Sequence, residues 1–188
     1  MVLLVLGVLI WSAAHLLPCT GASARARLIE RLGEDPYKGL FALTILVSVV
    51  LMVFGWRSAV PSLVYVAPLW TIPAANVLMF VALLLFAASA LPTNLKRILR
   101  HPQLTGVAVW AGAHLLSNGT NRSLVLFGGI GLWAVVAILA INRRDGAWQK
   151  PDPQPMSAEL KPLVAAVVAF VVLFLVHPWI AGVSPMPR

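Results

Sequence analysis

Charged residues are scarce in this sequence. Only 11% of its 188 residues are Asp, Glu, Lys or Arg, whereas about 25% is usual in soluble domains. Hydrophobic residues make up 60% of the chain. So few charges cannot cover a water-soluble surface, which excludes a soluble globular enzyme. The same hydrophobicity excludes intrinsic disorder, because disordered chains have few apolar residues.

Acidic residues are fewer still, and there is one cysteine. Six acidic against 14 basic residues give a formal net charge of +8. In a soluble protein this excess would suggest nucleic-acid binding, but in so apolar a chain we predict no nucleic-acid partner and assign the basic residues to membrane topology. The single cysteine, Cys19, excludes an internal disulfide.

The apolar residues gather in six runs, and each run predicts a helix that crosses a lipid bilayer. The runs cover residues 2–17, 40–56, 74–91, 104–117, 124–142 and 163–180. The first and fourth are short, because a bilayer-spanning helix needs roughly 17–25 residues. The first run lacks a positively charged leader, so we expect a retained span and not a signal peptide. We predict an all-α integral membrane protein, a six-helix bundle that forms one domain over residues 1–188.

The basic residues alternate between the loops that connect these runs. Most of them follow the first, third and fifth runs, while Arg57, Arg122 and Arg188 fall on the opposite side. Loops rich in Lys and Arg stay in the cytoplasm, so both termini are predicted to face the periplasm. All six acidic residues also lie in the predicted cytoplasmic loops. No span therefore holds a carboxylate, which excludes paired-carboxylate chemistry and an acidic proton relay at membrane depth.

Two of the predicted cytoplasmic loops have a recognisable character. Residues 22–32 are amphipathic and basic, which predicts an interfacial helix resting on anionic lipid. Residues 143–162 contain four prolines, which predicts an extended, semi-rigid connector.

Four histidines carry the remaining polar chemistry: His15, His101, His114 and His177. Three of them lie within or at the end of an apolar run, where an ionisable side chain is costly and marks a candidate functional site. Neutral imidazole is also a common ligand for metals and for haem iron. The alternative for each is a histidine that only bonds to a neighbouring helix.

Tryptophans accompany two of these histidines. Trp11 precedes His15 by four residues, and Trp110 precedes His114 by four. Asn118 follows His114 by four. Residues four apart share a helix face, so each set should form one stripe along its helix.

Depth along the helices suggests which histidines could meet. At 1.5 Å per residue, His15 lies about 3 Å from the cytoplasmic end of its run, and His114 lies about 15 Å from the cytoplasmic start of its own. Depth alone pairs His15 with His101, and His114 with His177. His101 and His114 are about 140° apart around one helix, so they cannot bind one ion from one face.

Three blocks of this sequence resemble the NnrU family of bacterial membrane proteins, which also contains the zeta-carotene isomerases. Together the blocks extend over nearly the whole chain. The first surrounds His15 and runs on to Leu40; the second runs from Arg100 to Gly119; the third begins at Val176 and ends at Gly182.

The resemblance implies a multi-pass protein of the bacterial inner membrane that is associated with nitrite and nitric oxide reduction in denitrification. Other membrane redox proteins would be its partners. The isomerase branch binds haem b through axial histidines at positions matching His15 and His114, which makes these two the first choice for haem and metal ligands. His15 with His101 is the second pair, and Arg100 could then pair with a haem propionate.

His177 and Asn118 complete the candidate cofactor-binding residues. Two other functions stay open. One is a haem-dependent carotenoid cis–trans isomerase, although the isomerase pattern has a cysteine where this chain has Ala111. The other is a membrane scaffold without catalysis or cofactor.

Overall fold

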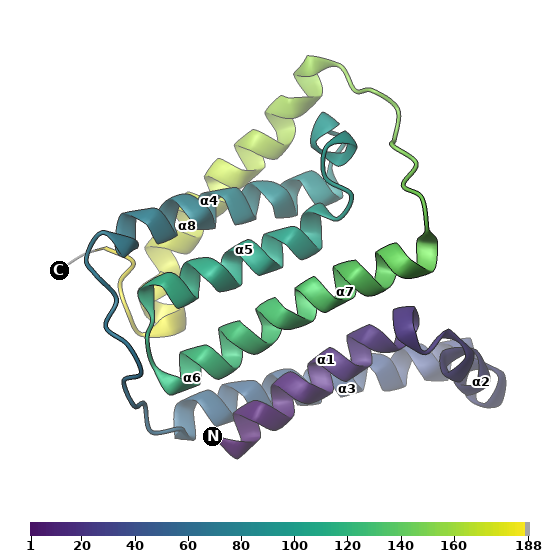
Figure 1. Cartoon of the computed structure of the whole chain (residues 1–188), viewed down its shortest axis with the longest axis horizontal. Coiled ribbons are helices and arrows are strands. Elements are labelled where there is room, and N and C mark those ends of the chain that lie inside the picture. Colours follow the sequence, from purple (N-terminus) through teal and green to yellow (C-terminus); the bar gives the residue numbers. More distant parts are fainter. Residues whose placement is uncertain (187–188) are drawn as a thin grey trace. The chain divides into compact units, whose positions relative to one another are not determined.

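The structure is a computed structural model that describes residues 1–186, in which helices are joined by loops and no strand is present (Figure 1). The prediction of an all-α protein is confirmed. Arg188, and with it the end of the predicted domain, lies outside the described residues. The α-helices are α1 (Val2–Thr20), α2 (Ala22–Leu32), α3 (Glu34–Ser58), α4 (Thr71–Ala90), α5 (Pro102–Ser117), α6 (Asn121–Ser123), α7 (Gly129–Asp145) and α8 (Leu160–Ala181). Three short helical segments complete the set: η1 (Asn94–Arg97), η2 (Leu124–Gly128) and η3 (Met156–Glu159).

Within residues 1–186, five helical stretches are long and apolar enough to cross a membrane. They are α1, α3, α4, the continuous stretch from α6 through α7, and the stretch formed by η3 and α8. Helix α5, which corresponds to the predicted run 104–117, has 16 residues. It is about 24 Å long, shorter than the roughly 30 Å hydrocarbon core of a bilayer. The chain is thus a multi-pass membrane protein, while the sixth span and the orientation of the termini remain predictions.

Large apolar side chains cover the outside of these helices. Leu46 and Phe54 on α3 are 59% and 60% exposed, and Val168 on α8 is 56% exposed. Such surfaces are unfavourable in water but match lipid tails, which are as apolar as leucine.

The chain divides into two compact units. Unit 1 comprises Met1–Val64 and Thr120–Gly146, and unit 2 comprises Tyr65–Gly119 and the residues from Ala147 onward. In unit 1, α1 packs against α3 and α7 (Figure 1). Glycine permits the close approach of α1 and α3, since a Cβ atom at Gly55 would lie 2.2 Å from the backbone nitrogen of Leu4.

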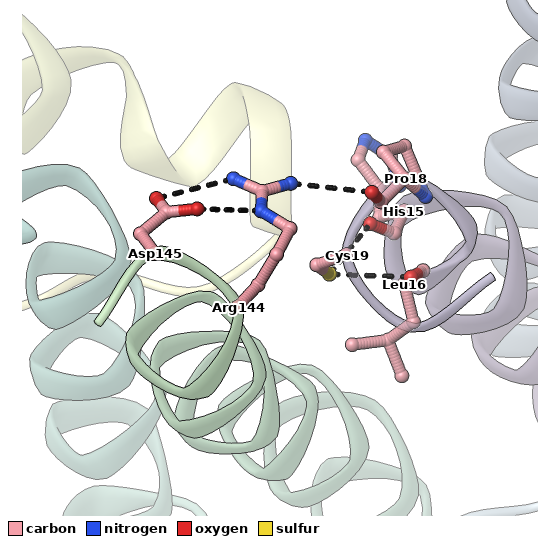
Figure 2. A network of polar contacts seen from close by, with 6 residues as sticks. All are labelled: His15, Leu16, Pro18, Cys19, Arg144 and Asp145. Carbon is pink, nitrogen blue, oxygen red and sulfur yellow. Dashed lines mark hydrogen bonds and ion pairs between the residues drawn. The ribbon is translucent and has the colours of Figure 1, made fainter. Parts of the chain in front are cut away.

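One end of unit 1 is closed by Arg144, in the last turn of α7 (Figure 2). Its guanidinium pairs with Asp145 at 2.6 Å and donates a hydrogen bond to the carbonyl of Pro18 at 3.2 Å. Pro18 lies in the last turn of α1, where carbonyls have no partner within the helix. Arg144 therefore ties the ends of α7 and α1 together.

In unit 2, α4 packs against α5 and α8 (Figure 1). The carboxylate of Glu159, just before α8, links the start of α8 to the segment that follows α4. It accepts hydrogen bonds from the hydroxyl of Thr93 at 2.5 Å and from the backbone N–H of Asn94 at 2.6 Å. The proline-rich connector is shorter than predicted, because α7 extends to Asp145 and η3 already begins at Met156.

Candidate functional site

His15 lies in α1 and is surrounded by aromatic rings of unit 1. Its ring centroid is 4.2 Å from that of Trp11, 5.2 Å from Trp133 and 5.6 Å from Phe41. The Nδ1 atom lies 2.9 Å from the carbonyl oxygen of Trp11. A carbonyl oxygen can only accept, so Nδ1 carries the hydrogen and Nε2 keeps its lone pair. The imidazole is thereby fixed in the tautomer that can ligate a metal through Nε2.

His114 lies in α5 of unit 2, and its imidazole has the same hydrogen-bond arrangement as that of His15. Its Nδ1 lies 2.9 Å from the carbonyl oxygen of Trp110, and the two rings are 4.9 Å apart. Each histidine thus bonds to the carbonyl of a tryptophan four residues earlier and packs on its ring. The two sequences that do this share the pattern W-x-x-A-H-L-L, at residues 11–17 and 110–116.

His177, near the end of α8, lies close to His114. Their ring centroids are 6.4 Å apart and the ring planes differ by 28°. The depth estimate from the sequence predicts this proximity. Nδ1 of His177 lies 2.7 Å from the carbonyl of Val183, beyond the end of the helix, so its Nε2 also keeps the lone pair.

A cavity of about 220 Å³ opens beside these two histidines, within unit 2. Helices α4, α5 and α8 line it with mostly apolar side chains, and so does the short segment that follows α8. The polar residues on its wall are Asn76, His114, Ser117, Asn118, His177 and Ser184.

The remaining predicted site residues take other places. Asn118 follows the end of α5 and donates a hydrogen bond from Nδ2 to the carbonyl of His114 at 2.9 Å. His101 is the N-cap of α5, directly after Arg100. It is 13 residues before His114, about 20 Å along the helix. The structure therefore separates His101 from the histidine pair of unit 2, and His15 belongs to unit 1.

Two buried donors beside His15 have no partner among the described residues. These are the indole nitrogens of Trp11 and Trp133. Trp133 is only 9% exposed. A buried N–H without an acceptor is costly, so an acceptor on a bound group would be favourable at this place. No group of three metal-ligating side chains (His, Cys, Asp or Glu) is present in residues 1–186.

Tyr65 supports the end of α5 that carries His114. Its hydroxyl donates to the backbone carbonyl of Leu115 and also lies 3.2 Å from the carbonyl of Asn118. Burial raises the pKa of the Tyr65 hydroxyl above its usual value. The hydroxyl consequently stays protonated and remains a donor.

A model of the NnrU protein family matches residues 3–185, nearly the whole described chain. The chain belongs to the NnrU family. The match spans both compact units, so His15, His101, His114 and His177 all fall within it. No curated protein and no solved structure matches the chain.

Sequence analysis did not identify two of the side chains around His15, Trp133 and Phe41. Nothing local marks them, because both come from other helices. A signal in the sequence does mark the similarity of the two histidines. The W-x-x-A-H-L-L pattern occurs twice, and this repeat indicates that the two imidazoles have matching local surroundings.

Proposed function

We propose that this NnrU-family protein binds haem b in the bacterial inner membrane, and that His15 and His114 would each supply a ligating nitrogen. One observation carries the proposal: both histidines hold the same local arrangement, with Nδ1–H on a tryptophan carbonyl and the lone pair on Nε2. This is the usual arrangement of histidines that ligate metals, because the second hydrogen bond orients the ring and makes it more basic.

The surroundings of His15 fit the same purpose. The aromatic rings of Trp11, Trp133 and Phe41 pack around the half-buried imidazole. The partnerless indole N–H groups of Trp11 and Trp133 could donate to an acceptor on a bound group. Bound haem would supply a one-electron redox centre whose potential depends on its axial ligands and on burial. The residues of the chain would orient and shield the ligating nitrogens.

This redox centre would serve nitrite and nitric oxide reduction, the role implied by the family resemblance, together with other membrane redox proteins. A strain that lacks the gene should reduce nitrite more slowly under oxygen limitation. The wild-type gene should restore the rate, whereas the His114→Ala variant should not. An equal rate in the deletion strain would contradict this role without affecting haem binding.

The absorption spectrum of the purified protein tests haem binding directly. The wild-type protein, produced with added haem precursor, should show a Soret band and sharp visible bands on reduction. His15→Ala and His114→Ala should each lose the haem or change its spectrum, and His177→Ala should change it less. Ser12→Ala, on the same helix as His15, is the matched control and should leave the spectrum unchanged.

The pairing of the ligands follows from the same variants. If His101→Ala removes the haem and His114→Ala does not, the ligands are His15 and His101. If only His114→Ala and His177→Ala remove it, the ligands are the two histidines of unit 2. A folded wild-type protein with no Soret band after haem supplementation would refute the proposal and leave a cofactor-free scaffold.

We also infer that α5 acts as a short sixth span and that both termini face the periplasm. The inference rests on the alternation of basic loops, in which the helix ends near Arg25, Lys96 and Arg143 lie on the cytoplasmic side. Alkaline phosphatase fused after the C-terminus should be active, since this reporter needs the periplasm. An inactive fusion with an active fluorescent reporter at the same place would contradict the orientation.

A further inference from the structure

The cavity of unit 2 has three polar side chains that backbone carbonyls hold in one orientation. Asn76 donates from Nδ2 to the carbonyl of Pro185 at 3.3 Å. Asn118 donates from Nδ2 to the carbonyl of His114 at 2.9 Å. Nδ1 of His177 lies 2.7 Å from the carbonyl of Val183. Asn76, Asn118 and His177 all line the cavity.

These contacts determine which polar atoms of the three side chains remain available to a ligand. Since a carbonyl oxygen only accepts, each amide must turn its nitrogen to the carbonyl and each imidazole its N–H. The remaining acceptors are the Oδ1 atom of each asparagine and the Nε2 atom of His177, and no hydrogen bond within residues 1–186 engages these three atoms. One N–H of Asn76 and the hydroxyl of Ser184 remain as donors, so acceptors are in the majority. The polar part of the wall thus favours a ligand that brings donors.

The rest of the wall is apolar and aromatic. Met79 and Leu83 come from α4, and Phe170, Leu173 and Phe174 come from α8. The described lining residues include no carboxylate, lysine or arginine, so the cavity suits a neutral ligand. Its volume is about 220 Å³. A dry apolar cavity of about 150 Å³ already holds benzene, so one substituted ring fits here.

We propose that this cavity binds the head group of a hydroquinone. The ring would pack against the phenylalanines of α8, and its hydroxyl groups would donate to the free acceptors of His177, Asn76 and Asn118. The oxidised quinone has carbonyl oxygens in place of hydroxyls, so it cannot donate to these three acceptors. This site goes beyond haem binding and does not require haem.

Binding of duroquinol, a tetramethylated hydroquinone, to the purified full-length protein tests the site. Its dimethyl ether has the same ring and lacks both donors, and dithionite keeps the quinol reduced without altering the ether. Titration calorimetry should give a dissociation constant for duroquinol at least about tenfold lower than for the ether, because a site built for hydroxyl groups discriminates against analogues without them. Asn76→Leu and His177→Phe should each weaken duroquinol binding about tenfold, and neither should weaken binding of the ether. Thr44→Val, on α3 of unit 1, is the control and should bind as the wild type does.

The proposal fails if the ether binds as tightly as duroquinol, or if both cavity variants bind duroquinol like the wild type. It also fails if His177→Phe loses haem, since the cavity then belongs to the haem site. Haem spectra of the same samples separate these results from a failure of haem binding: a protein without haem that still prefers duroquinol supports the cavity and refutes only the haem proposal. If one of these variants unfolds, Phe174→Ala provides a second test. It removes only contact with the ring, so it should weaken the binding of duroquinol and of its ether equally.

Discussion

The close approach of α1 and α3 gives the sharpest prediction, through Gly55→Ala. A Cβ atom at this position would lie 2.2 Å from the backbone nitrogen of Leu4 and 2.6 Å from its Cα. Both contacts are with backbone, and Leu4 is fully buried, so no side-chain rotation relieves them. Ordinary contacts between non-bonded carbon atoms are about 3.5–4.0 Å, so the two helices must separate by roughly 1 Å.

This separation sets the magnitude. A gap of about 0.5–1 Å forfeits a quarter to a half of the attraction at each contact, and in a membrane this packing is a main force between helices. Overpacking costs about 1–3 kcal/mol, and a direct backbone clash belongs at the upper end. Alanine recovers about 0.5–1 kcal/mol through its better helix propensity. The net loss should be about 1–2 kcal/mol, or about 2–8 °C in melting temperature for a chain of this size.

Gly39→Ala on the same helix is the control, because a Cβ atom there meets nothing within 4 Å. Both variants are melted in detergent and followed by circular dichroism. Gly55→Ala should melt several degrees below the wild type, and Gly39→Ala should melt at or slightly above it. Equal melting of the two variants would refute the close packing of α1 on α3.

Two further substitutions test unit 2. Glu159→Gln should lower the stability of the protein by about 1 kcal/mol, because the N–H of Asn94 loses its charged acceptor in a partly exposed place. Glu30→Gln is the control in the same thermal melt. Equal losses of stability in the two variants would contradict a contribution from the hydrogen bonds of Glu159. Tyr65→Phe should cost about 1 kcal/mol, with Tyr37→Phe as control, because the Tyr37 hydroxyl makes no hydrogen bond within residues 1–186. The raised pKa of Tyr65 means that its contribution is complete below its ordinary value of 10.0 and is lost as pH rises through the folded value. The difference between wild type and Tyr65→Phe should therefore shrink above about pH 10, and a constant difference across that range would contradict burial as the cause.

The positions of most helices follow from the sequence because hydrophobic runs are a local property. Five of the six predicted runs coincide with helices long enough to span a membrane, with the third run extending one residue beyond α4, and the segment 22–32 forms α2. Some helices extend beyond the apolar runs, because polar residues at their ends stabilise the additional turns. Glu34 and Asp35 begin α3 in its first turn, where the helix dipole favours acids, and Lys38 pairs with Glu34 at 2.9 Å.

Part of the candidate site is equally local. Trp11 and His15, like Trp110 and His114, are four residues apart, so their contacts follow from helix geometry alone. The tautomer of both imidazoles follows too, since each imidazole bonds to the carbonyl of the tryptophan four residues before it.

Only the tertiary structure decided the rest, because it depends on residues that are distant in the sequence. Phe41 and Trp133 reach His15 from α3 and α7, and no local pattern marks them. His177 has its tautomer fixed only because the chain turns back at Gly182, in a left-handed conformation that suits glycine, and brings the carbonyl of Val183 to its ring. The sequence by itself determined which helices carry histidines and how His15 and His114 are each set against a tryptophan four residues earlier. Packing determined which side chains meet across helices, and therefore that a cavity lined by acceptors lies beside His114.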